Sequence, residues 1–261
     1  IQTSSNLSIL SNRPQPEDTH MVKPNVRASL TRDDAQLALH VIASGRIDDL
    51  EEGERRLAHD GVDVLLDDPR LLIGLLRTDR GTMASYALVT YVVMRHALTR
   101  VGESDRVLAD FLASLFLEFG VRDRAQRISR FDDESYDTLG AILAAADSSD
   151  PKRSFLAREH LGNYALWLSG IFPDHIEERR WRKGGPDLEY YESMGRRGYE
   201  LASNHRLAQE AGISDFYALA ADRFRVMRIA LTSVSDALLF PNSNSPTSLI
   251  RRVEDDFRLM S

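Results

Sequence analysis

The sequence predicts an all-α protein, a compact multi-helix bundle of about ten helices with no sheet. From Leu30 onward, apolar residues recur with the period of a helix almost everywhere. The breaks between these segments carry the residues that typically start and stop helices. No segment alternates apolar and polar residues between turn signals as a half-buried strand does. Because no sequence signature recurs at a constant offset, a bundle is favoured over a solenoid.

The composition narrows the class of protein. A chain of 261 residues that is 43% apolar can bury a large core. With 40 acidic and 33 basic residues, the net charge is −7, which disfavours binding to nucleic acid or to an anionic membrane surface. The absence of cysteine removes disulfides, thiolate metal sites and cysteine nucleophiles, and it favours a cytoplasmic location. The most apolar windows are too short and too charged for the ~20-residue span of a membrane helix.

The first 28 residues show no apolar period and are predicted to be a flexible tail or a non-native leader. They lack the charged and apolar regions of a signal peptide. Met21 is a candidate for the true start of the protein, and an authentic mobile tail is the alternative. Residues 29–261 are predicted to form a single all-α domain.

Five helices are expected before residue 120. Thr31, followed by two aspartates, is typical of an N-cap with an acidic first turn, and Gly45 closes that helix. Pro69 suits the first helical position of a short helix that reaches Arg77. The expected ranges are 31–45, 47–60, 69–77, 81–100 and 103–119.

The second half of the chain contains the clearest predicted helix start. Ser149-Asp150-Pro151 places a capping side chain directly before a proline at the first helical position. Gly170, Gly184 and Gly212 each follow a periodic segment and are predicted stops. The expected ranges are 132–147, 151–169, 173–183, 187–211, 214–240 and a terminal helix from Ser245-Pro246.

The helix predicted over residues 187–211 carries three tyrosines, two interior glycines and a histidine. Helical phase places Tyr191, Gly195, Gly198 and His205 on one face. Each interior glycine costs about 1 kcal/mol relative to alanine, so something must approach this shallow face closely. The pattern favours a crossing helix. The alternative is a planar or acyl ligand, with Tyr191 and Tyr199 as walls and His205 at one end.

The helix predicted over residues 151–169 is the candidate neighbour of that face. His160 and Asn163 interrupt its otherwise apolar stripe, and Tyr164 lies beside them. Since an unsatisfied buried polar group costs about 1–3 kcal/mol, a structural hydrogen-bond pair is the favoured interpretation. A ligand contact or general base is the alternative. The ligand-binding hypothesis comprises His160, Asn163, Tyr164, Tyr191, Gly195, Gly198, Tyr199 and His205.

The sequence EERRWRKGG at 177–185 joins four cations to a tryptophan. The helix dipole favours cations in a last helical turn, so a solvated helix end is the favoured interpretation. Exposed tryptophan and arginine residues also dominate the binding energy of protein interfaces. Arg179, Arg180, Trp181 and Arg182 are therefore the candidate partner-binding residues.

No motif in the sequence specifies a reaction, and no catalytic residue is assigned. Nucleophile elbows and phosphate-binding glycine loops are absent. Outside the predicted tail, Glu-x-x-His pairs are absent too, and the adjacent Glu159 and His160 point about 100° apart on a helix. We therefore expect neither a metal site nor a cofactor.

One stretch resembles known proteins. HLGNYALWLSGIFPDHI followed by PDLEYYESMGRRGYELA, at about residues 158–199, is similar to a pattern in uncharacterised bacterial all-helical proteins. The pattern is a Leu-Gly helix, a Gly-x-Phe-Pro break, then paired tyrosines, a glycine and another tyrosine. The resemblance implies that the helix after Pro173 and the tyrosine-glycine helix form a unit. It transfers no catalytic residue.

The function hypothesis is a non-catalytic helical interaction protein that self-associates or binds a protein partner. The alternative is a small-molecule-binding module or enzyme with a pocket between residues 151–169 and 187–211. An enclosed cavity bordered by the candidate ligand-binding side chains would favour the alternative. Helix backbones in close contact over the two glycines would count against it.

Overall fold

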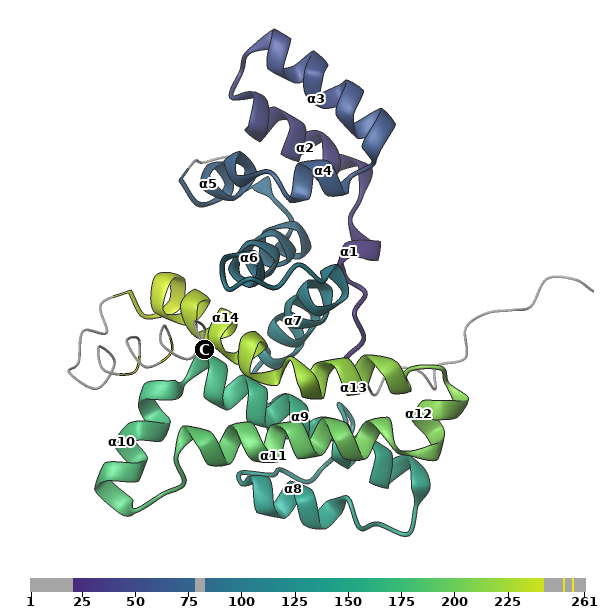
Figure 1. Ribbon diagram of the computed structural model, residues 1–261, viewed down its shortest axis with the longest axis vertical. Helices are drawn as coiled ribbons and strands as arrows, with labels where there is room; N and C mark the ends of the chain where they lie inside the picture. The colour runs from purple at the N-terminus through teal and green to yellow at the C-terminus, as the bar shows by residue number, and fades with distance from the viewer. Residues whose placement is uncertain (1–20, 78–82, 242–250, 252–254, 256–261) are drawn as a thin grey trace, which may run out of the picture.

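A computed structural model describes residues 21–77, 83–241, 251 and 255. Within these ranges the chain forms fourteen α-helices, eleven of them with seven or more residues, and no strand. The all-α prediction is confirmed. The helices lie in three tiers along the long axis of the molecule (Figure 1). No helix among the described residues has both the length and the hydropathy needed to cross a bilayer.

The upper tier consists of four helices: α2 (Arg32–Ala43), α3 (Ile47–Asp60), α4 (Asp63–Leu66) and α5 (Pro69–Arg77). Thr31 and Asp34 form a capping box, in which each side chain accepts a hydrogen bond from the backbone N–H of the other. Gly61 ends α3 and Pro69 opens α5, as the sequence predicts. Gly53 is the one buried residue of α3, so the outer side of this helix faces solvent.

The middle tier holds α1 (Val26–Ser29), α6 (Tyr86–Arg100) and α7 (Arg106–Phe119). Ser85 caps α6 by accepting a hydrogen bond from the N–H of Leu88, and Asp105 caps α7 in the same way. Both helices bury most of their side chains, so this tier carries a large part of the core.

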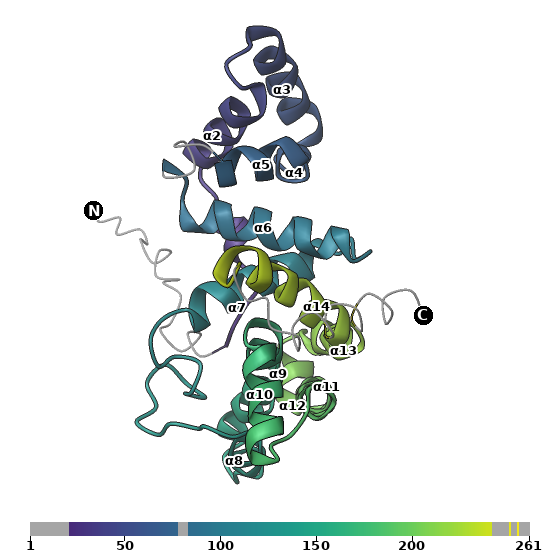
Figure 2. The ribbon, with the colours of Figure 1, turned by 90° about the vertical axis from the view of Figure 1, so that its left-hand side faces the viewer.

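The lower tier surrounds α9. It comprises α8 (Leu139–Ala145), α9 (Pro151–Ile171), α10 (Pro173–Lys183), α11 (Leu188–Ser203), α12 (Arg206–Glu210) and α13 (Ser214–Asp222). Helix α14 (Phe224–Val234) continues into a π-helix over Ser235–Leu239 and packs against α6, which joins the lower and middle tiers (Figures 1 and 2). Helix α9 is in contact with α7, α8, α10, α11, α12 and α14, and this explains why it is buried on nearly every side.

Residues 21–28 belong to the packed structure, although the sequence groups them with the N-terminal tail. Val22 and Val26 are buried. The N–H of Val22 donates to Glu159 Oε1 at 2.9 Å, and the N–H of Arg27 donates to Asp110 Oδ1 at 2.7 Å. Residues 1–20 of the tail predicted over residues 1–28 lie outside the described residues, as do residues 78–82 and the start of the terminal helix predicted from Ser245.

Two predicted helix boundaries in the lower tier are wrong. Gly170 does not stop α9, which continues to Ile171; a Cβ on Gly170 would lie 2.7 Å from Leu231 Cβ, so this glycine permits close packing of α14. Asp132 does not start a helix. Its side chain accepts a hydrogen bond from the N–H of Ser129 in a turn, and Thr138 caps α8 instead.

Two predicted continuous helices are interrupted. The helix expected over residues 187–211 ends at Ser203, and a second helix begins at Arg206. The helix expected over residues 214–240 is broken at Arg223 between α13 and α14. Neither break contains glycine or proline, the residues that mark such breaks most clearly in a sequence.

Candidate functional site

The shallow face of α11 is filled by protein atoms. A Cβ on Gly198 would lie 2.6 Å from the backbone nitrogen of Gly162 in α9, and a Cβ on Gly195 would lie 2.2 Å from the ring of Phe224 in α14. A Cβ on Gly162 would in turn lie 2.4 Å from the Tyr199 ring. These are the close approaches that only glycine permits. The prediction that a helix packs against the two glycines is confirmed.

His205 does not share this face with the glycines. It is the N-cap of α12, where its Nδ1 accepts a hydrogen bond from the N–H of Leu207 at 3.2 Å. Its ring packs on Phe155 with a centroid distance of 5.4 Å. The helical phase that grouped His205 with Gly195 and Gly198 required a continuous helix, and the break after Ser203 removes that condition.

Asn163 and Tyr199 belong to a buried chain of hydrogen bonds between α9 and α11. The Tyr199 hydroxyl donates to Asn163 Oδ1 at 2.9 Å, and Asn163 Nδ2 donates to Glu159 Oε1 at 3.0 Å. The same oxygen of Glu159 accepts from the N–H of Val22. The predicted structural hydrogen-bond role of Asn163 is confirmed, with one partner on α11 and one on its own helix.

Glu159 is a component of this cluster that the sequence analysis missed. Its side chain is 2% exposed, and burial raises the pKa of its carboxyl to about 8, so the group is neutral at pH 7. A sequence signal for it existed, since Glu159 lies one helical turn before Asn163 on α9.

His160 lies in an aromatic part of the core. Its ring stacks on Tyr164 at 5.9 Å between centroids and packs against Phe119. Burial, with the Arg124 guanidinium as a smaller cause, lowers the pKa of His160 to about 3. A neutral, enclosed imidazole of such low basicity has neither the pKa nor the access that a general base requires.

Tyr164 and Tyr191 are also almost fully enclosed. The structure therefore brings together most of the candidate ligand-binding residues as parts of one packed core. His205 is the member that it separates from them.

The C-terminal end of α10, unlike this packed core, is open to solvent. Residues 179–184 are all exposed, and the Trp181 side chain is 77% exposed. Gly184 ends the helix with a positive φ of 64°, which favours glycine. Arg180 lies 5.9 Å from the centroid of the Trp181 ring and pairs with Glu177 at 3.7 Å. Within the described residues, the other cations of this end, Arg179, Arg182 and Lys183, have no ion-pair partner.

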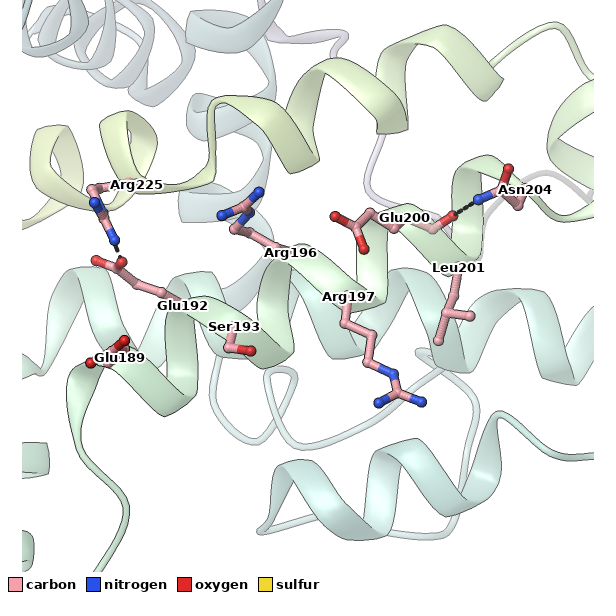
Figure 3. A pocket seen from close by; sticks show the side chains of 9 residues that line it. All are labelled: Glu189, Glu192, Ser193, Arg196, Arg197, Glu200, Leu201, Asn204 and Arg225. Carbon is pink, nitrogen blue, oxygen red and sulfur yellow. Dashed lines mark hydrogen bonds and ion pairs between the residues drawn. The ribbon is translucent and has the colours of Figure 1, made fainter.

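A charged groove of about 630 Å³ runs along the outer side of α11 (Figure 3). Its lining residues are Glu189, Glu192, Ser193, Arg196, Arg197, Glu200, Leu201, Asn204 and Arg225. In Figure 3, Arg196 and Glu200 point toward one side of α11 and Arg197 points toward the other. This groove was not predictable from the sequence, because helical phase alone does not show which exposed residues border a hollow.

A buried ionic cluster lies behind one end of the groove. Arg228 is fully buried; it donates to Glu192 Oε1 at 2.7 Å and to Asp255 Oδ2 at 3.2 Å. Arg225 reaches the second oxygen of Glu192 at 2.9 Å. The arginine is therefore neutralised on both sides, as a buried charge requires.

Within the part of the chain that the structure describes, no group of three His, Asp or Glu side chains is placed to hold a metal ion. Comparisons with protein-family models, with curated proteins and with solved structures found no match. The resemblance of residues 158–199 to bacterial helical proteins therefore stays a prediction.

Proposed function

We propose that this protein is a non-catalytic helical interaction protein that binds a protein partner through the exposed end of α10. We call this end the Trp181 surface and define it as residues 179–183. The observation that carries the proposal is the 77% exposure of Trp181 among cations. Tryptophan and arginine are the side chains that most often anchor protein interfaces.

The chemistry of the Trp181 surface favours an acidic partner. Arg179, Arg182 and Lys183 are exposed without an ion-pair partner among the described residues. The chain as a whole carries a net charge of −7, so these cations form a local reversal of sign. Such a reversal steers an acidic surface to this end of the molecule and repels basic ones.

The non-catalytic part of the proposal is supported by the packing of the lower tier. The alternative hypothesis places a ligand pocket between α9 and α11. At Gly198 and Gly162 the backbones of these two helices are in direct contact. A ligand there would have to separate two helix backbones. We also propose a cytoplasmic location, which the cysteine-free composition supports.

Site-specific cross-linking tests the proposed function. A photo-reactive amino acid replaces Trp181 in the full chain, which is expressed in its own host and irradiated. Tyr86, an aromatic residue that is 86% exposed at the start of α6, provides the matched control position. We expect discrete cross-linked protein species from position 181, identified by mass spectrometry, and their loss when Arg179 and Arg182 become glutamate. Equal cross-linking from positions 181 and 86 would count against the proposal.

A further inference from the structure

A second exposed surface carries unpaired charge of the opposite sign. On α3, Asp48, Glu51 and Glu54 are exposed and have no ion-pair partner among the described residues. Beside them, Ile47 is 73% exposed. Ile47, Glu51 and Glu54 follow one helical stripe, with Asp48 adjacent to it. We call these four residues the Ile47 surface.

The neighbouring acids of α3 are already neutralised and do not belong to this surface. Asp49 pairs with Arg46, and Glu52 pairs with Arg55. Over residues 47–54 of α3, the charge without an ion-pair partner among the described residues is thus confined to one side of the helix. Because Gly53 is the one buried residue of α3, the whole length of that side is accessible.

The Ile47 surface and the Trp181 surface carry equal numbers of charges of opposite sign. Three carboxylates without an ion-pair partner among the described residues, on Asp48, Glu51 and Glu54, match three such cations, on Arg179, Arg182 and Lys183. One exposed apolar side chain lies next to each set: Ile47 on the stripe of Glu51 and Glu54, and Trp181 in the same exposed end of α10 as the cations. Apolar contacts bordered by charged residues are common in protein interfaces.

The two surfaces cannot meet within one molecule. Helix α3 lies at the upper end of the long axis, and α10 lies in the lower tier, with the middle tier between them (Figures 1 and 2). A contact between the two surfaces therefore joins two copies of the chain. Because the surfaces differ, the contact is heterologous, and repeating it gives a ring or an open chain of molecules.

We propose that the partner of the Trp181 surface is a second copy of this chain, which presents its Ile47 surface in a head-to-tail contact. This inference rests on the proposed function and names its partner. Each surface is a few side chains wide, so the contact falls in the class of small, transient interfaces. Its charges are exposed, and added salt weakens the association.

Charge exchange tests the contact in the full chain. One variant combines Arg179→Glu with Arg182→Glu, a second combines Glu51→Lys with Glu54→Lys, and a third carries all four changes. Sedimentation velocity at low and high salt measures the association constant of each, and circular dichroism verifies its helicity. Arg100→Glu with Arg130→Glu, at two exposed positions on other faces, is the control for net charge.

We expect the wild-type chain to associate at low salt and each two-site variant to lose at least about tenfold in association constant, because like charges then face each other. The four-site variant, and an equimolar mixture of the two two-site variants, regain association because opposite charges face each other again. The control pair associates as the wild type does. A wild-type chain that stays monomeric at low salt overturns the inference, as does a four-site variant that stays monomeric.

The cross-linking experiment separates failure of this inference from failure of the proposed function. Cross-links from position 181 to the α3 peptide of a second copy support both. Cross-links to a different protein, from a chain that sediments as a monomer, overturn the head-to-tail contact and leave the proposed function standing. Equal cross-linking from positions 181 and 86 overturns both.

Discussion

Gly198 of α11 lies against the backbone of Gly162 of α9: a Cβ on Gly198 would be 2.6 Å from the Gly162 nitrogen and 3.0 Å from the Arg158 carbonyl oxygen. Backbone atoms cannot rotate away as the end of a side chain can. This contact therefore sets how closely the two helices approach.

Gly198→Ala should destabilise the fold by about 1–3 kcal/mol, the usual cost of overpacking, although alanine is the better helix former. The matched control is Gly140→Ala in α8, where a Cβ would meet no atom within 4 Å. That change should stabilise the fold by up to about 1 kcal/mol. Urea unfolding measures both. A Gly198→Ala protein as stable as the wild type would show that α9 and α11 can move apart.

Glu159 should make the protein less stable as the pH rises. Its carboxyl pKa is raised from the ordinary 4.5 to about 8, so folding favours the protonated form. This contribution to the free energy of unfolding is fully present below pH 4.5. It is lost as the pH rises to about 8, and the loss is at most about 5 kcal/mol.

Glu159→Gln removes this titration and keeps a side-chain oxygen for the N–H of Val22. The unfolding free energy of the variant relative to that of the wild type should increase by about 3 kcal/mol between pH 5 and pH 7. Urea unfolding at the two pH values measures the change, and Glu189→Gln, at an exposed position on α11, is the control. A relative stability independent of pH would mean that Glu159 is ionised in the folded protein.

His160 should make the protein less stable as the pH falls. Its pKa is lowered from 6.5 to about 3, so its contribution to stability is complete above pH 6.5 and is lost as the pH falls toward 3. His160→Phe removes the titration within the same aromatic surroundings, at a cost of about 1 kcal/mol for the lost hydrogen bond with the Ala125 backbone. We expect the acid-unfolding midpoint, followed by circular dichroism, to move to lower pH. An unchanged or higher midpoint would contradict the depressed pKa.

The helices with local start and stop signals were predictable from the sequence. The N-cap at Thr31, the pair Asp150-Pro151 and the terminal Gly184 act within one turn of chain, and each is where the sequence places it. The breaks at His205 and Arg223 contain neither glycine nor proline, so no local pattern marks them.

Some features of the candidate site were likewise predictable from the sequence, and others were not. The approach of a helix to Gly195 and Gly198 follows from the cost of two interior glycines and was predictable. The partners of Glu159 and Arg228 were not. Val22 lies 137 residues before Glu159, and Glu192 lies 36 residues before Arg228, so helical period carries no information about either pair.

Arg228 provides the last prediction, because its removal leaves two buried carboxylates without their shared cation. Arg228→Met should destabilise the fold by about 3 kcal/mol, near the lower end of the cost of breaking a buried ion pair. Arg225 still reaches Glu192, and Arg251 lies 3.9 Å from Asp255, so neither carboxylate is fully isolated.

Adding Asp255→Asn to Arg228→Met should recover part of this loss, since it removes one of the two uncompensated charges. Arg196→Met, at an exposed arginine with no ion-pair partner among the described residues, is the control and should change stability by less than about 0.5 kcal/mol. Urea unfolding of the four proteins gives the comparison. If Arg228→Met behaved like Arg196→Met, the charge of Arg228 would not be needed to hold Glu192 and Asp255 in the core.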